Sequence, residues 1–309
     1  MNYYNEIKNE LINNEVYKKV KDYSKNRNDL NTYYNVGKLL SEAGKHYGEG
    51  IIKKYSEKLT KEIGKKYNYR NLFIMRKFYI IFKDEKMNAL RSQLSWTHYR
   101  ELIKLKNIDE IKYYINISEQ QNLSYRELIN KIKNKEYERL DNETKLKLIE
   151  KSNEEENIKD FIKNPILIKN KYNTNKISEK VLQQIILENL KCFLCELGEG
   201  FTYISNEYKI KIGNRYNYID LLLYNIKFNC YVVIELKITE LKKEHIGQIS
   251  VYMNYIDNNL KKPGQNPTMG IIICKKNNKF IMKYVTDNKI LEREYELIWR
   301  RILWIIMKR

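Results

Sequence analysis

Residues 218–252 read YIDLLLYNIKFNCYVVIELKITELKKEHIGQISVY, and this stretch decides how the C-terminal half of the chain folds. Two short runs within it, residues 218–224 and 231–236, are rich in β-branched and aromatic residues, which predicts two strands. The residues between them, 225–229, are mostly polar and suit a short connection. We therefore expect the two strands to form a hairpin.

Each predicted strand carries one acidic residue where a buried apolar strand should have none, Asp220 in the first and Glu235 in the second. Lys237 follows Glu235 by two positions, and residues i and i+2 of a strand point to the same face of a sheet. A hairpin brings Asp220 to the same edge. The sequence therefore predicts that two carboxylates and one ammonium group converge at the edge of a sheet.

Such a cluster suits the hydrolysis of a phosphodiester bond, which needs a hard cation to neutralise charge and to supply an activated water. Mg²⁺ prefers one or two carboxylates and keeps waters and phosphate oxygens as its other ligands. A lysine beside the attacking water can lower the pKa of that water and stabilise the growing negative charge. A metal-dependent nuclease is the function that these three residues predict.

The same residues carry a family resemblance. Asp220, Glu235 and Lys237, spaced as Asp-x14-Glu-x-Lys, resemble the active-site pattern of the PD-(D/E)xK nuclease superfamily. Gln248-x-x-x-Tyr252, on a predicted helix, is similar to a pair found in the RecB-like nucleases of that superfamily. A single Glu-x-Lys on a strand is commonly a plain salt bridge, but the ordered set favours the nuclease.

The resemblance extends over roughly residues 17–295 to the YhcG-type nucleases. In the C-terminal half it rests on the segments ELGEGFTYIS, EYKI, YIDLLLYN, YVVIELK, GQISVYMN and PTMGIIICK. In the N-terminal half it rests on LTKEIGKKYNYRNLFIMRKFY, QLSWTHYREL and LSYRELINKI. The order of these segments is more specific than the catalytic pattern alone.

The resemblance implies a role for each site residue. Asp220 and Glu235 would hold the metal, and Lys237 would activate or orient the water. Gln248 would position the water or a phosphate, and Tyr252 would brace the site. It also implies Mg²⁺ (or Mn²⁺) as the cofactor and nucleic acid, foremost DNA, as the partner.

Members of the superfamily often place a further Glu on the first helix of the nuclease domain. Glu179 and Glu188 both lie on the helix predicted over residues 177–197, and the sequence does not choose between them.

The fold class that follows is a helical N-terminal domain followed by a PD-(D/E)xK, restriction-endonuclease-like α/β domain. We predict a helical nucleic-acid-binding domain at 1–150, a charged linker at 151–173 and the nuclease domain at 174–309. The linker prediction rests on an acidic run at 154–156 and on Pro165. Around the hairpin we expect a helix at 243–258 and strands at 201–205, 207–212, 269–274 and 280–285.

Apolar residues at helical spacing predict N-terminal helices at 2–23, 30–46, 51–63, 69–82 and 125–132. Ser124 and Glu127 form a capping-box pattern before the last of them. The helices at 51–63 and 69–82 resemble a helix-turn-helix, and so does the segment 108–121 with the helix at 125–132. Trp96 is expected to anchor the core, and His98 to be a packed or capping residue. The residues that we expect to contact phosphates are Arg70, Arg76, Lys77, Arg100 and Arg126.

The composition agrees with an anionic partner, because 58 Lys and Arg residues give a formal net charge of +19. The chain is also crowded with Lys, Asn, Ile and Tyr, which an AT-rich genome produces without selection for binding, so the charge supports the prediction without deciding it. Cys192-x-x-Cys195 has zinc-like spacing but no second pair, so we expect reduced cysteines. A polar N-terminus and the lack of a membrane-length apolar run indicate a cytoplasmic protein with no transmembrane segment.

Two other functions stay open on the sequence. The chain could be a catalytically silent nucleic-acid-binding subunit of a defence or mobile-element complex, or an RNase of the same fold. A homodimer is also open. The apolar, basic tail at 297–309 suits a membrane-surface helix, a helix for a partner, or a terminal element that packs on its own domain.

Overall fold

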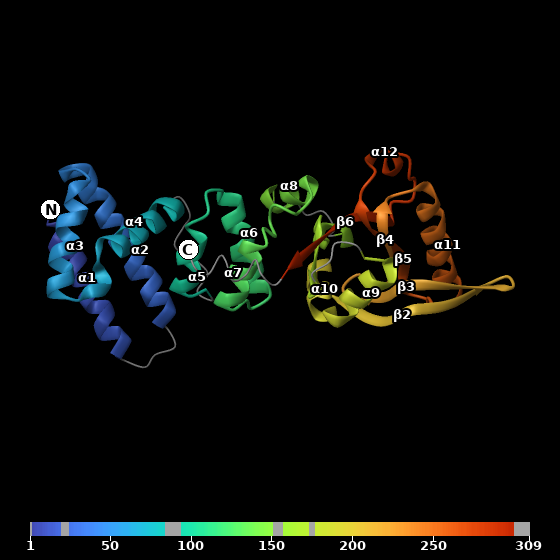
Figure 1. The fold of residues 1–309 in the computed structure, drawn as a ribbon. Coiled ribbons are helices and arrows are strands. Elements are labelled where there is room, and N and C mark those ends of the chain that lie inside the picture. The colour runs from blue at the N-terminus through green and yellow to red at the C-terminus, as the bar shows by residue number, and fades with distance from the viewer. Residues whose placement is uncertain (1, 20–24, 84–93, 151–156, 173–176, 300–309) are drawn as a thin grey trace. The chain divides into compact units, whose positions relative to one another are not determined.

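The computed structural model describes residues 2–19, 25–83, 94–150, 157–172 and 177–299 (Figure 1). The chain divides into two compact units, Met1–Tyr137 and Glu138–Arg309, which we describe separately and name, after the predictions from the sequence, the helical unit and the nuclease unit. The acidic run at 154–156 and the end of the tail, residues 300–309, lie outside the described residues.

The helical unit contains only helices in its described part, which confirms the predicted class of this half. Its helices are α1 (Tyr3–Lys19), α2 (Lys25–Tyr47), α3 (Gly50–Glu62), η1 (Lys65–Tyr67), α4 (Tyr69–Phe82), α5 (Trp96–Leu102), α6 (Ile108–Gln120) and α7 (Tyr125–Lys133). Leucine, isoleucine and tyrosine side chains from α1, α2, α3 and α4 form the main buried cluster, with Leu11, Leu40, Ile52 and Leu72 fully buried.

The closest helix packing in this unit lies where α2 meets α4. A Cβ atom added to Gly37 would overlap the carbonyl oxygen of Met75 and would lie 2.9 Å from the Cβ of Tyr79. Only a residue without a side chain fits at this crossing, so Gly37 sets how near the two helices come.

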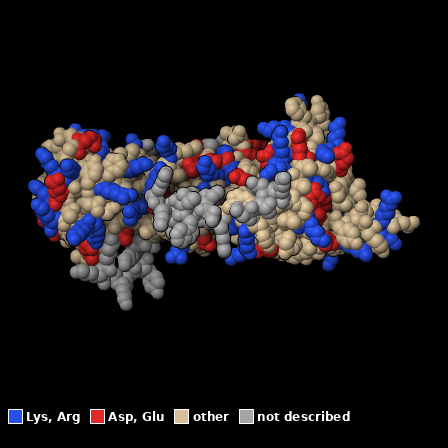
Figure 2. Space-filling model, in the orientation of Figure 1, with Lys and Arg blue, Asp and Glu red and all other residues tan. Residues whose placement is uncertain are grey.

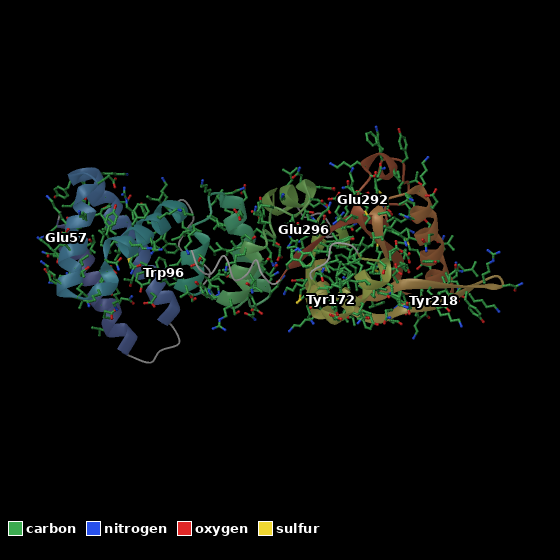
Figure 3. All side chains as sticks on the ribbon, in the orientation of Figure 1. Glu57, Trp96, Tyr172, Tyr218, Glu292 and Glu296 are labelled. Atoms are coloured by element: carbon green, nitrogen blue, oxygen red, sulfur yellow. The ribbon has the colours of Figure 1, made fainter. Side chains whose placement is uncertain are left out.

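Several predicted local features of the helical unit are present. The backbone N–H of Ser124 donates to Glu127 Oε2 at 2.8 Å and the N–H of Glu127 donates to Ser124 Oγ at 3.4 Å, which confirms the capping box. The ring of Trp96, labelled in Figure 3, lies 4.6 Å from that of Tyr33 and packs against the core. His98 caps its own helix, since its Nδ1 lies 2.7 Å from Ser95 Oγ.

The nuclease unit is built on one six-stranded sheet with the strand order β1-β6-β5-β4-β3-β2. The strands are β1 (Ile166–Asn170), β2 (Phe201–Ile212), β3 (Arg215–Asn225), β4 (Cys230–Glu240), β5 (Asn266–Lys276) and β6 (Ile290–Trp299). The first four strands in this order pair in parallel, and β3 is antiparallel to both β4 and β2. The helices are α8 (Asn142–Glu150), η3 (Ile158–Phe161), α9 (Glu179–Glu188), α10 (Leu190–Leu197), α11 (Lys243–Asn259) and α12 (Lys279–Met282).

The two faces of the sheet bury two separate apolar clusters, because side chains alternate along each strand. On β4, Val232, Ile234 and Leu236 face the cluster that α9 and α10 cover. The next residue along, Val233, faces the cluster that α11 covers. Glu235 and Lys237 have the parity of Val233, so they belong to the α11 face.

The hairpin of β2 and β3 is longer than the rest of the sheet and extends beyond it (Figure 1). Its outer half carries three basic residues, Lys209, Lys211 and Arg215, and no acidic residue between Tyr208 and Ile219. Lys209 Nζ lies 3.9 Å from the ring centroid of Tyr216. We call residues 208–219 the basic arm.

The observed boundaries differ from the predicted ones around the linker. The two units meet after Tyr137 rather than at residue 150, and residues 166–170 of the predicted linker form β1. The sequence of β1, ILIKN, is short, and charged residues surround it, so its apolar pattern did not predict a strand. Its partner is β6, far along the chain, and that pairing makes it a strand.

The predicted strand at 280–285 is wrong, because these residues form most of α12 and the turn after it. Asn278 caps this short helix by accepting a hydrogen bond from the N–H of Ile281 at 3.3 Å. The strand that completes the sheet is β6, which the sequence analysis did not identify as a strand.

Two smaller differences affect the elements around the hairpin. The strands predicted at 201–205 and 207–212 form the single strand β2, with a register shift between Tyr203 and Ser205. The helix predicted at 177–197 is divided at Asn189 into α9 and α10. Among the described residues, no helix is both long enough and apolar enough to cross a membrane.

Candidate active site

Asp220 lies on β3 at the point where the basic arm joins the sheet. Its carboxylate Oδ2 accepts a hydrogen bond from the backbone N–H of Leu236 on β4 at 2.8 Å. Its carbonyl oxygen accepts a hydrogen bond from Nε2 of Gln183 on α9 at 2.9 Å. These two contacts hold the carboxylate beside β4 at the level of Glu235 and Lys237, as the hairpin prediction requires.

Glu235 is buried in the middle of the sheet, with 1% of its surface exposed. Its Oε2 accepts a hydrogen bond from Lys237 Nζ at 3.2 Å. Its Oε1 is buried and has no hydrogen-bond partner within the described ranges. A buried carboxylate oxygen without a partner is costly, and a cation is a ligand that would satisfy it.

Lys237 contacts carboxylates from two elements, β4 and α9. Besides Glu235, its Nζ lies 3.7 Å from Oε2 of Glu179, the first residue of α9. The other candidate, Glu188, lies at the opposite end of α9, where its Oε1 accepts a hydrogen bond from the hydroxyl of Tyr172 at 2.6 Å. The geometry therefore brings Glu179, and not Glu188, to Lys237.

The electrostatics of the cluster are those of carboxylates crowded in a poorly solvated place. The pKa of Glu235 is raised to about 7, chiefly by burial and then by the nearby charge of Asp220, while Lys237 opposes the shift. Burial also raises the pKa of Asp220, against the Leu236 N–H and the charge of Lys237, which lower it. A cation bound between the two carboxylates would favour the ionised form of both.

The ammonium group of Lys237 is held in its charged form. Burial by itself lowers the pKa of Lys237, but Glu235, Glu179 and Asp220 outweigh burial and raise this pKa above its ordinary value. At neutral pH the lysine is therefore a fixed positive charge and a hydrogen-bond donor.

Gln248 and Tyr252 form the pair that their spacing predicts. Gln248 Nε2 donates a hydrogen bond to the Tyr252 hydroxyl at 3.0 Å, one turn apart on α11. Tyr252 is 5% exposed and packs in the same apolar cluster as Val233, on the face of the sheet that Glu235 shares. Tyr252 thus fixes the direction of the Gln248 amide on that face.

One further polar residue faces the cluster. His245 lies in the first turn of α11, where its Nδ1 accepts a hydrogen bond from the N–H of Lys242 at 3.2 Å. Burial and then the charge of Lys237 lower the pKa of His245, so the imidazole is neutral at neutral pH. The sequence analysis missed it, because it had no strand or metal-ligand spacing to single it out.

The donor set fits a hard divalent cation. Within the described ranges, no group of three or more His, Cys, Asp and Glu side chains could hold a metal ion. Mg²⁺ and Mn²⁺ need fewer protein ligands, because waters and phosphate oxygens supply the others. The carboxylates of Asp220 and Glu235 meet that smaller requirement, since Oε1 of Glu235 has no hydrogen-bond partner among the described residues.

The five basic residues expected to contact phosphates have different environments. Arg76 is engaged within the helical unit: its Nη2 donates to Glu49 Oε1 at 2.7 Å, and its side chain is 15% exposed. Arg70 on α4 and Arg126 on α7 are exposed, and Lys77 on α4 and Arg100 on α5 are half-buried.

Two family models match the chain, one for each unit. The model of the YhcG PDDEXK nuclease domain matches residues 159–301, and the model of the DUF1016 N-terminal domain matches residues 8–139. A curated protein of Escherichia coli (strain K12), "Putative nuclease YhcG", is 22% identical to this chain. The alignment covers 86% of this chain and 82% of that protein.

Two solved structures are similar to part of the chain. A repair endonuclease from Pyrococcus abyssi is 20% identical, with 40% of this chain and 50% of that chain covered and a TM-score of 0.29. A complex of EndoMS with double-stranded DNA is 18% identical, with 41% and 48% covered and a TM-score of 0.31. The chain spans about half the length of each of these two proteins.

Proposed function

Because the chain belongs to the family of YhcG-type PD-(D/E)xK nucleases, we propose that it hydrolyses phosphodiester bonds of DNA with Mg²⁺ or Mn²⁺. The observation that carries this proposal is the cluster of Asp220, Glu235 and Lys237, with the buried, unpaired Oε1 of Glu235 at its centre.

Asp220 and Glu235 would hold the metal. A bound Mg²⁺ or Mn²⁺ would supply positive charge to the phosphate and would make the attacking water more acidic. The N–H of Leu236 fixes the direction of the Asp220 carboxylate, and Lys237 occupies Oε2 of Glu235, which leaves Oε1 for a ligand.

Lys237 would stabilise the negative charge that develops on the phosphate and orient the water. Its raised pKa keeps the ammonium group charged through neutral pH, so it serves as a donor and not as a base. Glu179 would position Lys237 from the start of α9. Gln248, directed by Tyr252, would position the water or a phosphate oxygen.

Nucleic acid would be bound by both units. In the helical unit, Tyr69, Arg70 and Phe73 are exposed on α4. This helix therefore offers two aromatic rings and a positive charge close together. In the nuclease unit, the basic arm leads directly from Lys209, Lys211 and Arg215 into Asp220 (Figure 1). Tyr218, labelled in Figure 3, belongs to this arm and is exposed on β3 two residues before Asp220. Lys and Arg here would contact phosphates and give binding that weakens with salt.

The test is a cleavage assay on single-stranded, duplex and branched DNA and on RNA, each with Mg²⁺, Mn²⁺ or EDTA. We expect cleavage of DNA with either metal and none with EDTA. Asp220→Asn and Glu235→Gln should lose cleavage, whereas Glu188→Gln, at the other end of α9, should retain it. Preference for RNA would make the protein an RNase of this fold, and binding without cleavage under every condition would make it a silent binding subunit.

A further inference from the structure

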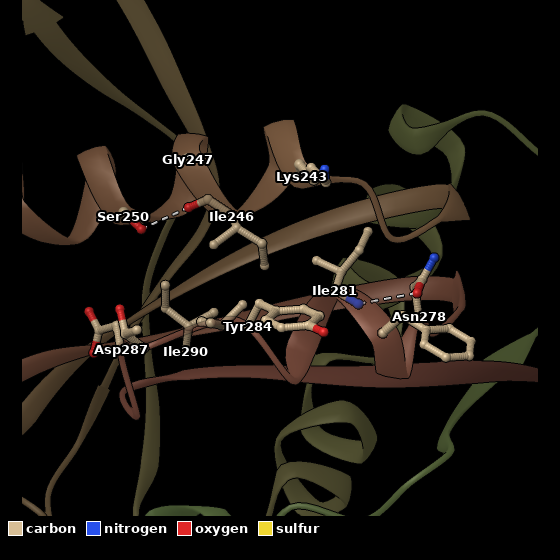
Figure 4. Close-up of a pocket in the computed structure, with 12 residues that line it drawn as sticks. Lys243, Ile246, Gly247, Ser250, Asn278, Ile281, Tyr284, Asp287 and Ile290 are labelled. Atoms are coloured by element: carbon tan, nitrogen blue, oxygen red, sulfur yellow. Dashed lines mark hydrogen bonds between the residues drawn. The ribbon is translucent and has the colours of Figure 1, made fainter.

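A separate concave site lies outside the candidate active site. It is a cavity of about 780 Å³ between α11 and the segment from Asn278 to Ile290, which contains α12 (Figure 4). Ile246, Gly247 and Ser250 form the α11 wall. Its size lies within the range of small-molecule and cofactor pockets.

The strands place this cavity at the same end of the sheet as the catalytic cluster. Lys237 on β4 is paired with Cys274 on β5, and α12 follows a few residues after the end of β5. Asn278 Nδ2 donates to Glu240 Oε1 at the end of β4, at 2.9 Å, which ties the α12 segment to the strand of Glu235. The helix α11 carries both the cavity wall and Gln248, so the two sites share an element.

Two aromatic residues are left exposed on the α12 side of the cavity. Phe280 is 83% exposed and Tyr284, one turn later, is 78% exposed, which makes them the most exposed large apolar side chains in the described part of the chain. Figure 4 shows the ring of Tyr284 between Ile281 and Ile290, with Ile246 of α11 opposite. Neither ring contributes to the buried clusters, so packing does not account for their presence.

The surroundings of the cavity are basic. The exposed lysines around it are Lys242 and Lys243 at the start of α11, Lys276 at the end of β5, and Lys279 and Lys283 at the two ends of α12. Of the acidic residues nearby, Glu240 and Glu244 are exposed, whereas Asp287, Glu292 and Glu294 are partly buried. Glu240 accepts a hydrogen bond from Asn278, and Glu294 accepts one from the N–H of Asn277. Figure 2 shows Lys and Arg atoms beside the uncharged atoms over α12.

Exposed rings together with lysines are the features that bind unpaired nucleotides, since bases stack on aromatic faces and phosphates pair with cations. A base enclosed in a duplex cannot present its face to Phe280 or Tyr284. A basic protein segment would find little charge complementarity here, and an acidic one would compete with the phosphates that the neighbouring cluster is proposed to bind.

We propose that this cavity binds one unpaired base of the strand whose phosphate lies at Asp220 and Glu235, with Tyr284 and Phe280 as the stacking surfaces. The preferred substrate is then a nucleic acid with an unpaired nucleotide beside the cut bond, such as a single strand, a flap or a frayed end. This inference rests on the proposed function and names the substrate class of the same site.

The test uses the full-length protein in EDTA, so that binding is measured without cleavage. Anisotropy of labelled DNA compares a single strand, a duplex with a flap and a blunt duplex, for the wild type and for Phe280→Ala/Tyr284→Ala. We expect the double variant to bind the single strand and the flap about tenfold more weakly, the loss of roughly one stacked base. Binding of the blunt duplex should change less than twofold. Tyr172→Ala, which removes a partly exposed ring near Glu188, is the matched control and should change neither.

Substitutions that retain or remove aromatic character separate stacking from simple apolar contact. Tyr284→Trp should bind the single strand as well as the wild type, whereas Tyr284→Leu should behave like the alanine variant. A strand with one 2-aminopurine base next to the cut position should lose fluorescence on binding the wild type and not on binding the double variant.

Two results would overturn the inference. Unchanged binding by the double variant would show that no base stacks in this cavity, and an equal loss on the blunt duplex would show a general contribution to nucleic-acid affinity. Both are measured in EDTA, so they are independent of whether the protein cuts. If no substrate is cut with any metal, the proposed function fails, and the binding result stands by itself.

Discussion

At the scale of single residues, Lys237 separates catalysis from binding most clearly. Lys237→Ala should reduce the rate of single-turnover cleavage about a hundredfold or more, because one electrostatic stabiliser of the transition state is lost. DNA affinity at fixed salt should change little, since one contact among many contributes modestly. Lys262→Ala, the same change in the exposed loop after α11, is the control and should cut normally. Near-normal cleavage by Lys237→Ala would reduce Lys237 to a salt-bridge partner.

Glu235 makes stability depend on pH in a direction opposite to that of an ordinary surface carboxylate. Its pKa is about 7 in the folded protein and near its ordinary value of 4.5 when unfolded, so the folded state holds a proton that the unfolded state releases. Without metal, stability should therefore fall as pH rises from about 4.5 through about 7. In EDTA the melting temperature of the wild type should drop across this window relative to that of Glu235→Gln.

Metal should reverse this effect. A divalent cation binds the ionised carboxylates of the folded state and should raise the melting temperature most above about pH 7, where Glu235 has lost its proton. Glu235→Gln should gain little from Mg²⁺ at any pH. Melting curves of the two proteins that stay parallel across pH, with and without Mg²⁺, would contradict the assignment of Glu235 as a titrating metal ligand.

Residue spacing predicted part of the site and left part undecided. Asp220, Glu235 and Lys237 were predictable because strand alternation and a short hairpin fix where their side chains point. Glu179 and Glu188 lie at opposite ends of α9, and only the approach of that helix to the sheet brings one of them to Lys237. Arg76 likewise has its partner Glu49 in the turn before α3, which local sequence does not reveal.

At the scale of elements, two glycines of α2 should respond in opposite ways to the same substitution. Gly37→Ala places a methyl group against the backbone of Met75 on α4 and should destabilise the helical unit by about 1–3 kcal/mol, as overpacking does. Gly44→Ala meets atoms only at 3.4 Å or beyond, which is ordinary contact, and should stabilise α2 by about 0.5–1 kcal/mol. Chemical denaturation measures both, and equal effects would contradict the tight crossing of α2 and α4.

Elements were predictable where their own residues determine them. The hairpin, α11 and β5 have continuous apolar patterns and matched closely, and so did α4 and α7 with their polar caps. β1 and β6 are strands because each pairs with a distant partner, so their short or charge-interrupted patterns were insufficient. α12 was mistaken for a strand because it is only four residues long, too short to show a helical spacing of its apolar residues.

At the scale of the whole molecule, the boundary after Tyr137 predicts which fragments fold. Residues 138–309 should fold alone, because Arg293 on β6 donates from Nη2 to Asp141 Oδ2 at 2.8 Å and from Nε to the Ile162 carbonyl oxygen at 3.1 Å. A fragment of residues 174–309 lacks both partners and β1, and should be unfolded or aggregated, since β6 becomes an exposed edge. Circular dichroism and gel filtration compare the folding and the oligomeric state of the two fragments directly. A folded, monomeric fragment of residues 174–309 would support a domain boundary near residue 174.

The position of β6 between β1 and β5 also affects how the protein is made. During synthesis β1 leaves the ribosome without its neighbour, and the bond from the Glu294 N–H to Asn164 Oδ1 joins residues 130 positions apart. The strands β2, β3 and β4 can pair as soon as they emerge, because their partners are adjacent in sequence. The strands β3 and β4, which carry the catalytic residues, would thus be paired while β1 is still unpaired. A nascent chain stalled before β6 would present two unpaired strand edges, β1 and β5, to chaperones.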